Sequence, residues 1–195
     1  MAPILIFACN QPRRTEFAAS GVAWEGATPL LYAAEINNLE VIRALVDGGA
    51  DPLIPTEQGT SALVLAAGGG TDLSRPRPRQ ERATAVETAK FLVEHGADVN
   101  GAGQFGWAPL HAASYQGLND VIEYLASAGA DPDQMDGFGQ TALSICNAVI
   151  TEGIGAAYYQ AARVFRRDTA DLLLSLGATP LEDSEVVQVT QRATD

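Results

Sequence analysis

Three glycines in one short stretch are the first feature of this sequence that could do chemistry. Gly101, Gly103 and Gly106 have the spacing G-x-G-x-x-G, and an acidic residue, Glu123, follows them. In dinucleotide-binding proteins this spacing lets the backbone approach a pyrophosphate, and a carboxylate roughly 20 residues further on binds a ribose hydroxyl. The stretch therefore raises the question of a nucleotide-dependent enzyme.

The context of these glycines argues against a nucleotide site. A dinucleotide-binding loop follows a β-strand and opens a helix. Here GAGQFG follows KFLVEHGADVN, which has the apolar spacing and closing glycine of a helix end, and the equivalent loops LIPTEQG and DQMDGFG keep only the last glycine. We interpret Gly106 as a structural residue and Gly101 and Gly103 as incidental, and we expect no cofactor.

The other reactive residue types do not form a catalytic group. His95 stands at the end of a predicted helix, and His111 opens another, where we expect it to hydrogen-bond the backbone. Cys9 and Cys146 lie 137 positions apart with no C-x-x-C pair, and the apolar surroundings of Cys146 predict a small buried side chain. A nucleophile paired with a base is not indicated, and we expect no enzyme activity.

A string of acidic residues has weak metal-binding character. Asp131, Asp133 and Asp136 resemble the start of a calcium loop, but the glycine and the distal glutamate of such a loop are missing. Asp131 also recurs at the same place as Asp51 and Asp98, after each Gly-Ala pair. This recurrence indicates turn formation rather than a metal site.

The composition limits the class of partner. The chain has 195 residues, 47% hydrophobic and 18% charged, with a net charge of −12. This charge argues against nucleic acid and against anionic membrane surfaces, and favours a neutral or basic partner. No apolar run approaches the ~20 residues of a membrane span, and MAPILIFACN lacks the basic start of a signal peptide. We expect a cytoplasmic, monomeric protein.

An internal repeat organises the sequence. Gly-Ala pairs begin at Gly49, Gly96, Gly129 and Gly177, and predicted helix openings start at Thr28, Ser61, Ala108 and Thr141. The openings lie 33, 47 and 33 residues apart, which gives a 33-residue unit with an insertion of 14 residues in the second unit and one of 15 in the fourth. Each unit predicts an alanine-rich helix, an apolar second helix ended by glycine, and a polar turn.

A turn and two antiparallel helices in 33 residues resemble the ankyrin repeat, through Thr28-Pro29-Leu30, Pro109-Leu110-His111 and the Gly-Ala-Asp triplets. The resemblance implies an all-α, ankyrin-repeat solenoid. No unit has both the threonine and the histidine of the family motif T-P-L-H, so we expect their shared hydrogen bond to be absent and the units to be less stable. The predicted repeats cover 26–180, as four units at 26–58, 59–105, 106–138 and 139–180.

The insertions and ends have separate predictions. The Arg/Pro-rich segment 68–83 is expected to be an extended loop, either solvated or recognising an acidic partner, and 151–168 is expected to lengthen the helices of the last repeat. Residues 1–25 are an incomplete repeat or cap; of the two readings, a folded-back cover or a piece of a longer array, we favour the second. The tail 181–195 is either a short strand or frayed.

The resemblance implies that the chain binds a protein on the concave side formed by the finger loops and first helices. By position, that side contains Trp24, Glu25, Glu57, Gln58, Thr60, Gln104, Phe105, Trp107, Tyr115, Gln116, Phe138 and Gln140. Aromatic residues in polar surroundings are typical of binding hot spots, and Trp107 and Tyr115 are the main expected contacts. Phe105 and Phe138 could equally pack on neighbouring fingers. The alternative is a structural segment of a larger repeat protein with mainly intramolecular contacts.

Overall fold

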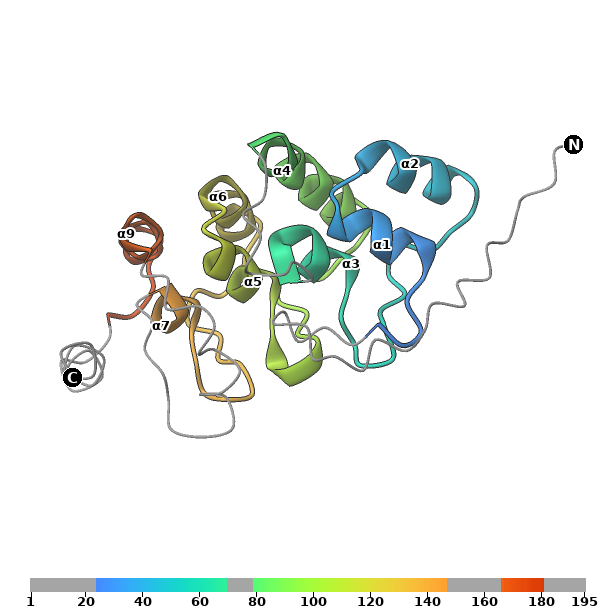
Figure 1. Ribbon diagram of the computed structural model, residues 1–195. Coiled ribbons are helices and arrows are strands. Elements are labelled where there is room, and N and C mark those ends of the chain that lie inside the picture. The colour runs from blue at the N-terminus through green and yellow to red at the C-terminus, as the bar shows by residue number, and fades with distance from the viewer. Residues whose placement is uncertain (1–23, 70–78, 147–165, 181–195) are drawn as a thin grey trace, which may run out of the picture.

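Two rows of short helices form the part of the chain that the structure, a computed structural model, describes: residues 24–69, 79–146 and 166–180 (Figure 1). The first row contains α1 (Pro29–Glu35), α3 (Ala62–Val64), α5 (Pro109–Gln116) and α7 (Ala142–Cys146). The second row contains α2 (Leu39–Asp47), α4 (Arg79–Glu94), α6 (Asn119–Ser127) and α9 (Arg167–Ser175). Each first-row helix packs on its second-row partner and on the next helix of its own row.

Loops that project from the same side of the first row connect successive pairs (Figure 1). We call them finger 1 (24–28), finger 2 (48–61), finger 3 (95–108) and finger 4 (128–141). The described residues contain no β-strand, and apart from these loops, the short turns within each helix pair and the residues after α9 they are helical. The expected all-α solenoid of stacked helix pairs is confirmed.

The first helices begin where the sequence predicts. Thr28 Oγ1 accepts a hydrogen bond from Leu31 N at 3.4 Å, and Ser61 Oγ accepts one from Val64 N at 3.3 Å. Thr141 Oγ1 accepts from Ser144 N at 3.3 Å in the same way. These side chains satisfy backbone donors that a helix start leaves without partners.

The second helices end at the glycines of the Gly-Ala pairs. Gly49, Gly96, Gly129 and Gly177 have φ angles of 94°, 95°, 95° and 99°. A side chain disfavours this left-handed backbone conformation, so glycine ends the helix at little cost and the chain turns back toward the fingers.

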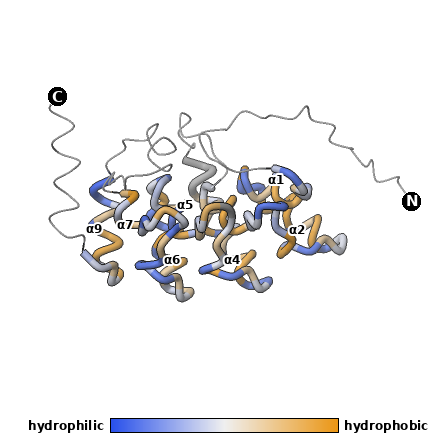
Figure 2. The backbone as a smooth tube through the Cα atoms, turned by 90° about the horizontal axis from the view of Figure 1, so that it is seen from below, coloured by the Kyte–Doolittle hydropathy of each residue, from blue (hydrophilic) through white to orange (hydrophobic). Residues whose placement is uncertain are grey.

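The core lies between the two rows and between neighbouring pairs. Ile42, Leu92, Leu125 and Leu173, one from each second-row helix, are completely buried. They meet alanine-rich first helices, whose small side chains let the backbones approach closely. Figure 2 shows apolar stretches in both rows, as expected when each pair covers the next.

The expectation of an extended loop over the Arg/Pro-rich segment 68–83 is wrong at its C-terminal end, because α4 begins at Arg79. At the other end, the helical turn η1 (Leu65–Gly69) follows α3 and is interrupted at the buried Gly68, whose φ of 110° is not helical. Arginine, glutamine and glutamate are good helix formers, so the end of the inserted segment extends α4 to 16 residues. The predictions for residues 1–23, 147–165 and 181–195 lie outside the described residues.

Candidate functional site: the finger row

The four fingers repeat one turn that holds one side chain at the same place in each. In every finger a glycine with positive φ comes four residues or fewer before the first helix: Gly26 (74°), Gly59 (85°), Gly106 (79°) and Gly139 (75°). The residues just before these glycines are Glu25, Gln58, Phe105 and Phe138. We call these four residues the finger row.

A backbone hydrogen bond closes each of fingers 2, 3 and 4 at the same position. Thr56 N donates to Thr60 O at 3.0 Å, Gly103 N to Trp107 O at 2.9 Å, and Asp136 N to Gln140 O at 2.9 Å. The Asp136 carboxylate adds to finger 4, because its Oδ1 accepts from Phe138 N at 2.8 Å and from Gln140 N at 2.9 Å. Hydrogen bonds within each of these fingers therefore stabilise its turn.

Neighbouring fingers are also bound to one another. Glu57 N donates to Glu25 O at 2.8 Å, and Gly137 N donates to Phe105 O at 2.6 Å. Fingers 2 and 3 are close enough that a Cβ on Gly103 would lie 2.9 Å from Thr60 Cα. The interpretation of Gly103 as incidental is therefore wrong: it is required by the approach of a neighbouring backbone, which is not visible in its own loop.

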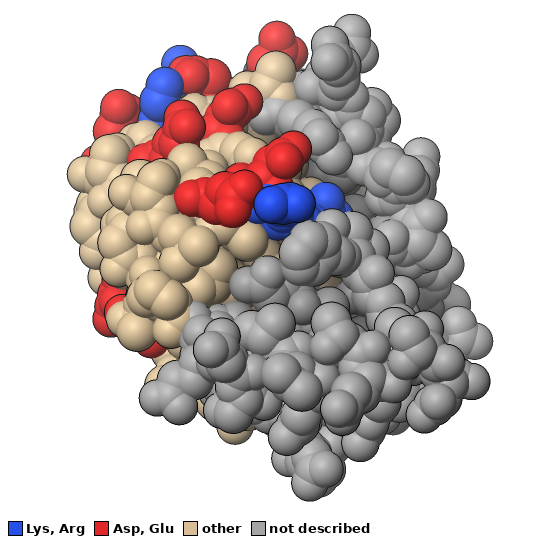
Figure 3. Space-filling model, turned by 90° about the vertical axis from the view of Figure 1, so that its left-hand side faces the viewer, with Lys and Arg blue, Asp and Glu red and all other residues tan. Residues whose placement is uncertain are grey.

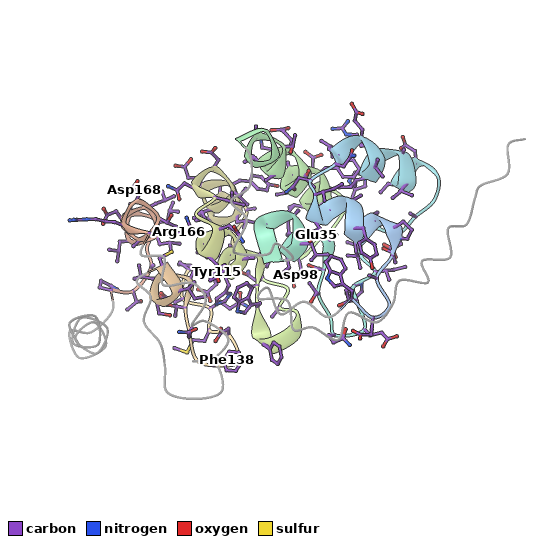
Figure 4. The ribbon with its side chains drawn as sticks, viewed as in Figure 1. Glu35, Asp98, Tyr115, Phe138, Arg166 and Asp168 are labelled. Carbon is purple, nitrogen blue, oxygen red and sulfur yellow. The ribbon has the colours of Figure 1, made fainter. Side chains whose placement is uncertain are left out.

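The aromatic members of the row lie side by side. The ring centroids of Phe105 and Phe138 are 5.7 Å apart, and Phe105 is 39% exposed. Phe105 also has a φ of 60°, a conformation that costs a residue with a side chain some free energy. Figure 4 shows Phe138 at the outer end of finger 4, away from both rows of helices. The two roles considered for these residues were contact with a partner and packing between neighbouring fingers. The structure shows the packing, and part of the Phe105 side chain remains exposed to solvent.

Trp107 and Tyr115 lie beneath the finger row rather than on the surface. They are only 8% and 7% exposed, and their ring centroids are 5.6 Å apart. Tyr115 lies near the end of α5 (Figure 4), and its carbonyl accepts a hydrogen bond from Arg166 Nε at 2.8 Å. Both residues were predicted to be the main contacts with a partner, whereas this structure buries both side chains.

The remaining residues of the expected surface divide by exposure. Gln116, Gln140 and Thr60 are buried at 8%, 2% and 2% exposure. Glu25 and Glu57 are exposed, whereas Gln58 and Trp24 are half-buried. Gln104 starts the short turn η2 (Gln104–Gly106). The exposed part of the expected surface is therefore acidic at fingers 1 and 2 and aromatic at finger 3, and Phe138 of finger 4 is half-buried.

Tyr32 joins this surface although the sequence analysis did not include it. Its ring stacks on that of Trp24, with centroids 4.7 Å apart and planes within 10°, and it is 39% exposed. Leu65, Ala112 and Ile145 occupy the same position in the other first helices. An aromatic residue therefore stands at this position in the first repeat and not in the other three. That difference was the sequence signal that could have identified Tyr32.

His111 connects the helix row to the fingers. Its Nδ1 accepts from Ala108 N at 3.2 Å, and its Nε2 lies 3.1 Å from Gln140 O, to which the neutral ring donates. Burial lowers the pKa of His111, although the Asp136 carboxylate acts in the opposite direction. The predicted backbone bonding of His111 is confirmed. It also provides repeat 3, which has Ala108 in place of a capping hydroxyl, with an acceptor at the helix start.

The residues considered for chemistry have structural partners. Asp51, Asp98 and Asp131 each accept a bond from the amide two residues on, at 2.8, 2.9 and 2.9 Å, which confirms their predicted role in turns. Cys146 is 1% exposed, and burial raises the pKa of its thiol to about 12. Among the described residues, no cluster of three or more His, Cys, Asp or Glu side chains could hold a metal ion.

The outer faces of the second helices are acidic. The exposed acidic side chains there are Glu40, Asp47, Glu87, Glu94, Asp120, Glu123, Asp168 and Asp171. Figure 3, seen from the α9 end, shows acidic side chains gathered along the upper rim with few basic ones between them. In the part of the chain described, no helix is both long enough and apolar enough to span a bilayer.

Stacked helix pairs with a row of aligned finger loops define a class of helical repeat protein. Comparison with known sequences identifies the repeat. The profile described as ankyrin repeats in three copies matches residues 82–136, and the single ankyrin repeat profile matches residues 25–57. The chain is an ankyrin repeat protein, a family whose repeats generally mediate protein–protein interaction.

The related proteins are varied in their whole-chain roles. The chain is 31% identical over 134 residues to ankyrin repeat protein L86 of Acanthamoeba polyphaga mimivirus, covering 62% of this chain and 23% of that protein. It is 46% identical over 48 residues to human protein phosphatase 1 regulatory subunit 27, covering 25% and 31%. It is 27% identical over 160 residues to the palmitoyltransferase AKR1 of Lachancea kluyveri, covering 68% and 21%. The chain spans less than a third of the length of each.

Proposed function

We propose that this chain binds a partner protein through its finger row, together with the Trp24–Tyr32 stack beside it. The observation that supports the proposal is the alignment of Glu25, Gln58, Phe105 and Phe138 by repeated glycine turns and by hydrogen bonds between fingers. A surface that is already ordered loses little conformational entropy when a partner docks. Two neighbouring aromatic rings are the kind of anchor that carries much of the free energy of binding.

The partner that fits this row is apolar opposite fingers 3 and 4 and basic opposite fingers 1 and 2. Phe105 and Phe138 need an apolar contact, whereas Glu25 and Glu57 are exposed carboxylates on an acidic chain. Opposite charge on the partner would accelerate encounter and orient the complex. Within this proposal the chain acts as a monomer and has no catalysis of its own.

The test compares substitutions inside and outside the row. Phe105→Ser combined with Phe138→Ser removes the aromatic pair, and Leu174→Ser is the control, because Leu174 is a 42% exposed apolar residue on α9. Tagged wild-type chain and both variants are used to capture proteins from the source cells, and each captured protein is quantified by mass spectrometry. A partner identified in this way is then titrated against each chain by calorimetry.

The proposal expects the double variant to weaken binding of that partner by about a thousandfold, since two hot-spot residues at about 2 kcal/mol each contribute about 4 kcal/mol and 1.4 kcal/mol is about tenfold. The Leu174→Ser variant should bind as the wild type does. Equal binding by the wild type and the double variant, with circular dichroism unchanged, would remove the finger row from consideration.

A second role is supported by a different surface. Two apolar residues of the first helix pair, Ile36 directly after α1 and Val41 on α2, are 58% and 43% exposed. In a stacked array this surface would pack on a preceding repeat, so the chain would then be a structural segment of a larger repeat protein. Ile36→Ser with Val41→Ser should raise the solubility of the isolated chain if this surface needs a cover, and should leave capture through the finger row unchanged.

A further inference from the structure

One asparagine in finger 3 lies in a chemically reactive sequence. The chain has six asparagines, and Asn100 alone is followed by glycine. Because glycine has no side chain, its backbone nitrogen can approach the amide carbon of the preceding asparagine with little steric hindrance. An Asn-Gly pair is therefore the sequence in which an asparagine most readily loses its side-chain amide nitrogen by spontaneous deamidation.

The side chain of Asn100 holds fingers 3 and 4 together. Its Oδ1 accepts from Asp131 N at 2.8 Å, and its Nδ2 donates to Gly129 O at 3.0 Å. The Asn100 carbonyl also accepts from Gln134 Nε2 at 3.0 Å. One amide thus provides both a donor and an acceptor across the junction, and a carboxylate could replace only the acceptor.

We propose that Asn100 is a deamidation site and that its conversion uncouples finger 3 from finger 4. Gly101 N attacks Asn100 Cγ, the nitrogen loses its proton, and ammonia leaves from Cγ to give a cyclic succinimide. Water then opens the ring at either carbonyl, and the product is aspartate or isoaspartate. The reaction needs no oxidant or further reagent, and the inference does not rest on the proposed binding function.

The folded junction restrains the reaction. Both polar atoms of the Asn100 side chain are engaged on finger 4, and Gly101 N donates to Asp98 O at 3.2 Å. The attack requires the Gly101 nitrogen and the Asn100 amide carbon to leave these positions and meet. The rate therefore follows local opening of the junction, an event less costly than global unfolding. Asn100 is half-buried, so water reaches the opened site.

The product cannot restore the junction. A carboxylate oxygen would face Gly129 O, acceptor against acceptor, where the amide now donates. The new negative charge would also join Asp98, whose Oδ1 accepts from Asn100 N at 2.9 Å, and Asp131. Isoaspartate would further lengthen the backbone by one carbon. Fingers 3 and 4 carry Phe105 and Phe138, so deamidation would loosen the aromatic pair.

The test follows the reaction and its product in the full chain. Wild-type chain is incubated in mildly alkaline buffer at body temperature, with and without urea, and peptides are mapped by mass spectrometry over time. Gly101→Ala is the chemical control, since the added Cβ hinders the attack and Gly101 does not have a positive φ. Asn100→Asp mimics the product. Asn119→Asp is its matched control, because Asn119 Oδ1 accepts from Thr169 Oγ1 at 2.7 Å and a carboxylate keeps that role.

The proposal expects Asn100 to deamidate faster than every other asparagine in urea, and at least about tenfold more slowly in the folded chain. Gly101→Ala should slow the reaction in urea. Asn100→Asp should raise the equilibrium constant for unfolding by about tenfold, and Asn119→Asp by less than about threefold. The proposal is overturned if Asn100 is no faster than the other asparagines in urea, if folding gives no protection, or if the two Asp variants are equally stable.

Discussion

Replacing His111 with alanine should destabilise the protein far more than replacing its other histidine. His111 is 1% exposed and connects Ala108 N, at the start of α5, to Gln140 O of finger 4. His111→Ala removes both hydrogen bonds and leaves a cavity; Ala108 N loses its side-chain acceptor, whereas Gln140 O keeps the bond from Asp136 N. The two lost bonds, the buried donor and the cavity together are expected to lower the free energy of unfolding by about 3 kcal/mol.

The control is His95→Ala. His95 is exposed, its Nδ1 lies 2.7 Å from Phe91 O, and its ring lies 4.0 Å from that of Phe91. Because water can replace these contacts, the expected loss is below about 1 kcal/mol. Urea unfolding followed by circular dichroism measures both variants. Equal losses for the two histidines would refute the assignment of His111 as a buried link between helix and finger.

The same residue gives a pH dependence with a defined sign. Burial lowers the pKa of His111 below its ordinary value of 6.5, so the folded chain binds fewer protons there than the unfolded chain. The stability from neutral His111 is complete above about pH 6.5 and decreases as the pH falls toward the folded-state pKa, by at most about 1.4 kcal/mol per pH unit. His111→Ala should flatten the change between about pH 7 and about pH 5 relative to wild type. A wild-type slope retained in the variant would show that other groups cause it.

Three further substitutions or reactions test separate parts of the structure. Gly103→Ala should lower the free energy of unfolding, measured in urea, by about 1–3 kcal/mol, because its Cβ would lie 2.9 Å from Thr60 Cα and only backbone movement could relieve the contact. An unchanged free energy of unfolding would mean that fingers 2 and 3 lie further apart. Leu125→Ala removes a fully buried side chain between pairs and should cost about 2–5 kcal/mol, whereas a loss below about 1 kcal/mol would contradict its burial. Cys146, with its thiol pKa raised to about 12, should be alkylated by iodoacetamide at least about a hundredfold more slowly in the folded chain than in urea, as followed by peptide mapping; equal rates would contradict the buried position.

Features that depend on one repeat could be predicted from the sequence. The Gly-Ala glycines end their helices because their local chemistry requires it, and Asp51 and Asp98 form turns with amides two residues away. His111 bonds the backbone near its own helix opening. The partners in these interactions are only a few residues apart in the sequence, so the pattern within one repeat is enough to predict them.

Features that depend on contact between repeats could not be predicted in the same way. Gly103 is required by Thr60 of the preceding finger, and Trp107 and Tyr115 are buried although their repeat positions suggested a surface. The periodicity shows that the fingers are equivalent, but it gives neither the distance between them nor the depth of each ring. For that reason the residues of the finger side could be ranked by type from the sequence and could not be ranked by exposure.

The central claim is that the fingers are held edge to edge, by hydrogen bonds between fingers 1 and 2 and between fingers 3 and 4 and by the close approach of Gly103 to Thr60 between fingers 2 and 3. Nuclear magnetic resonance tests it through scalar couplings across hydrogen bonds, from Glu57 N to the Glu25 carbonyl and from Gly137 N to the Phe105 carbonyl, which the structure places at 2.8 and 2.6 Å. We expect both couplings to be observed and both amides to exchange slowly with solvent. Absent couplings together with amide exchange as fast as in an unfolded chain would show that the fingers move independently, and the proposed ordered surface would not exist.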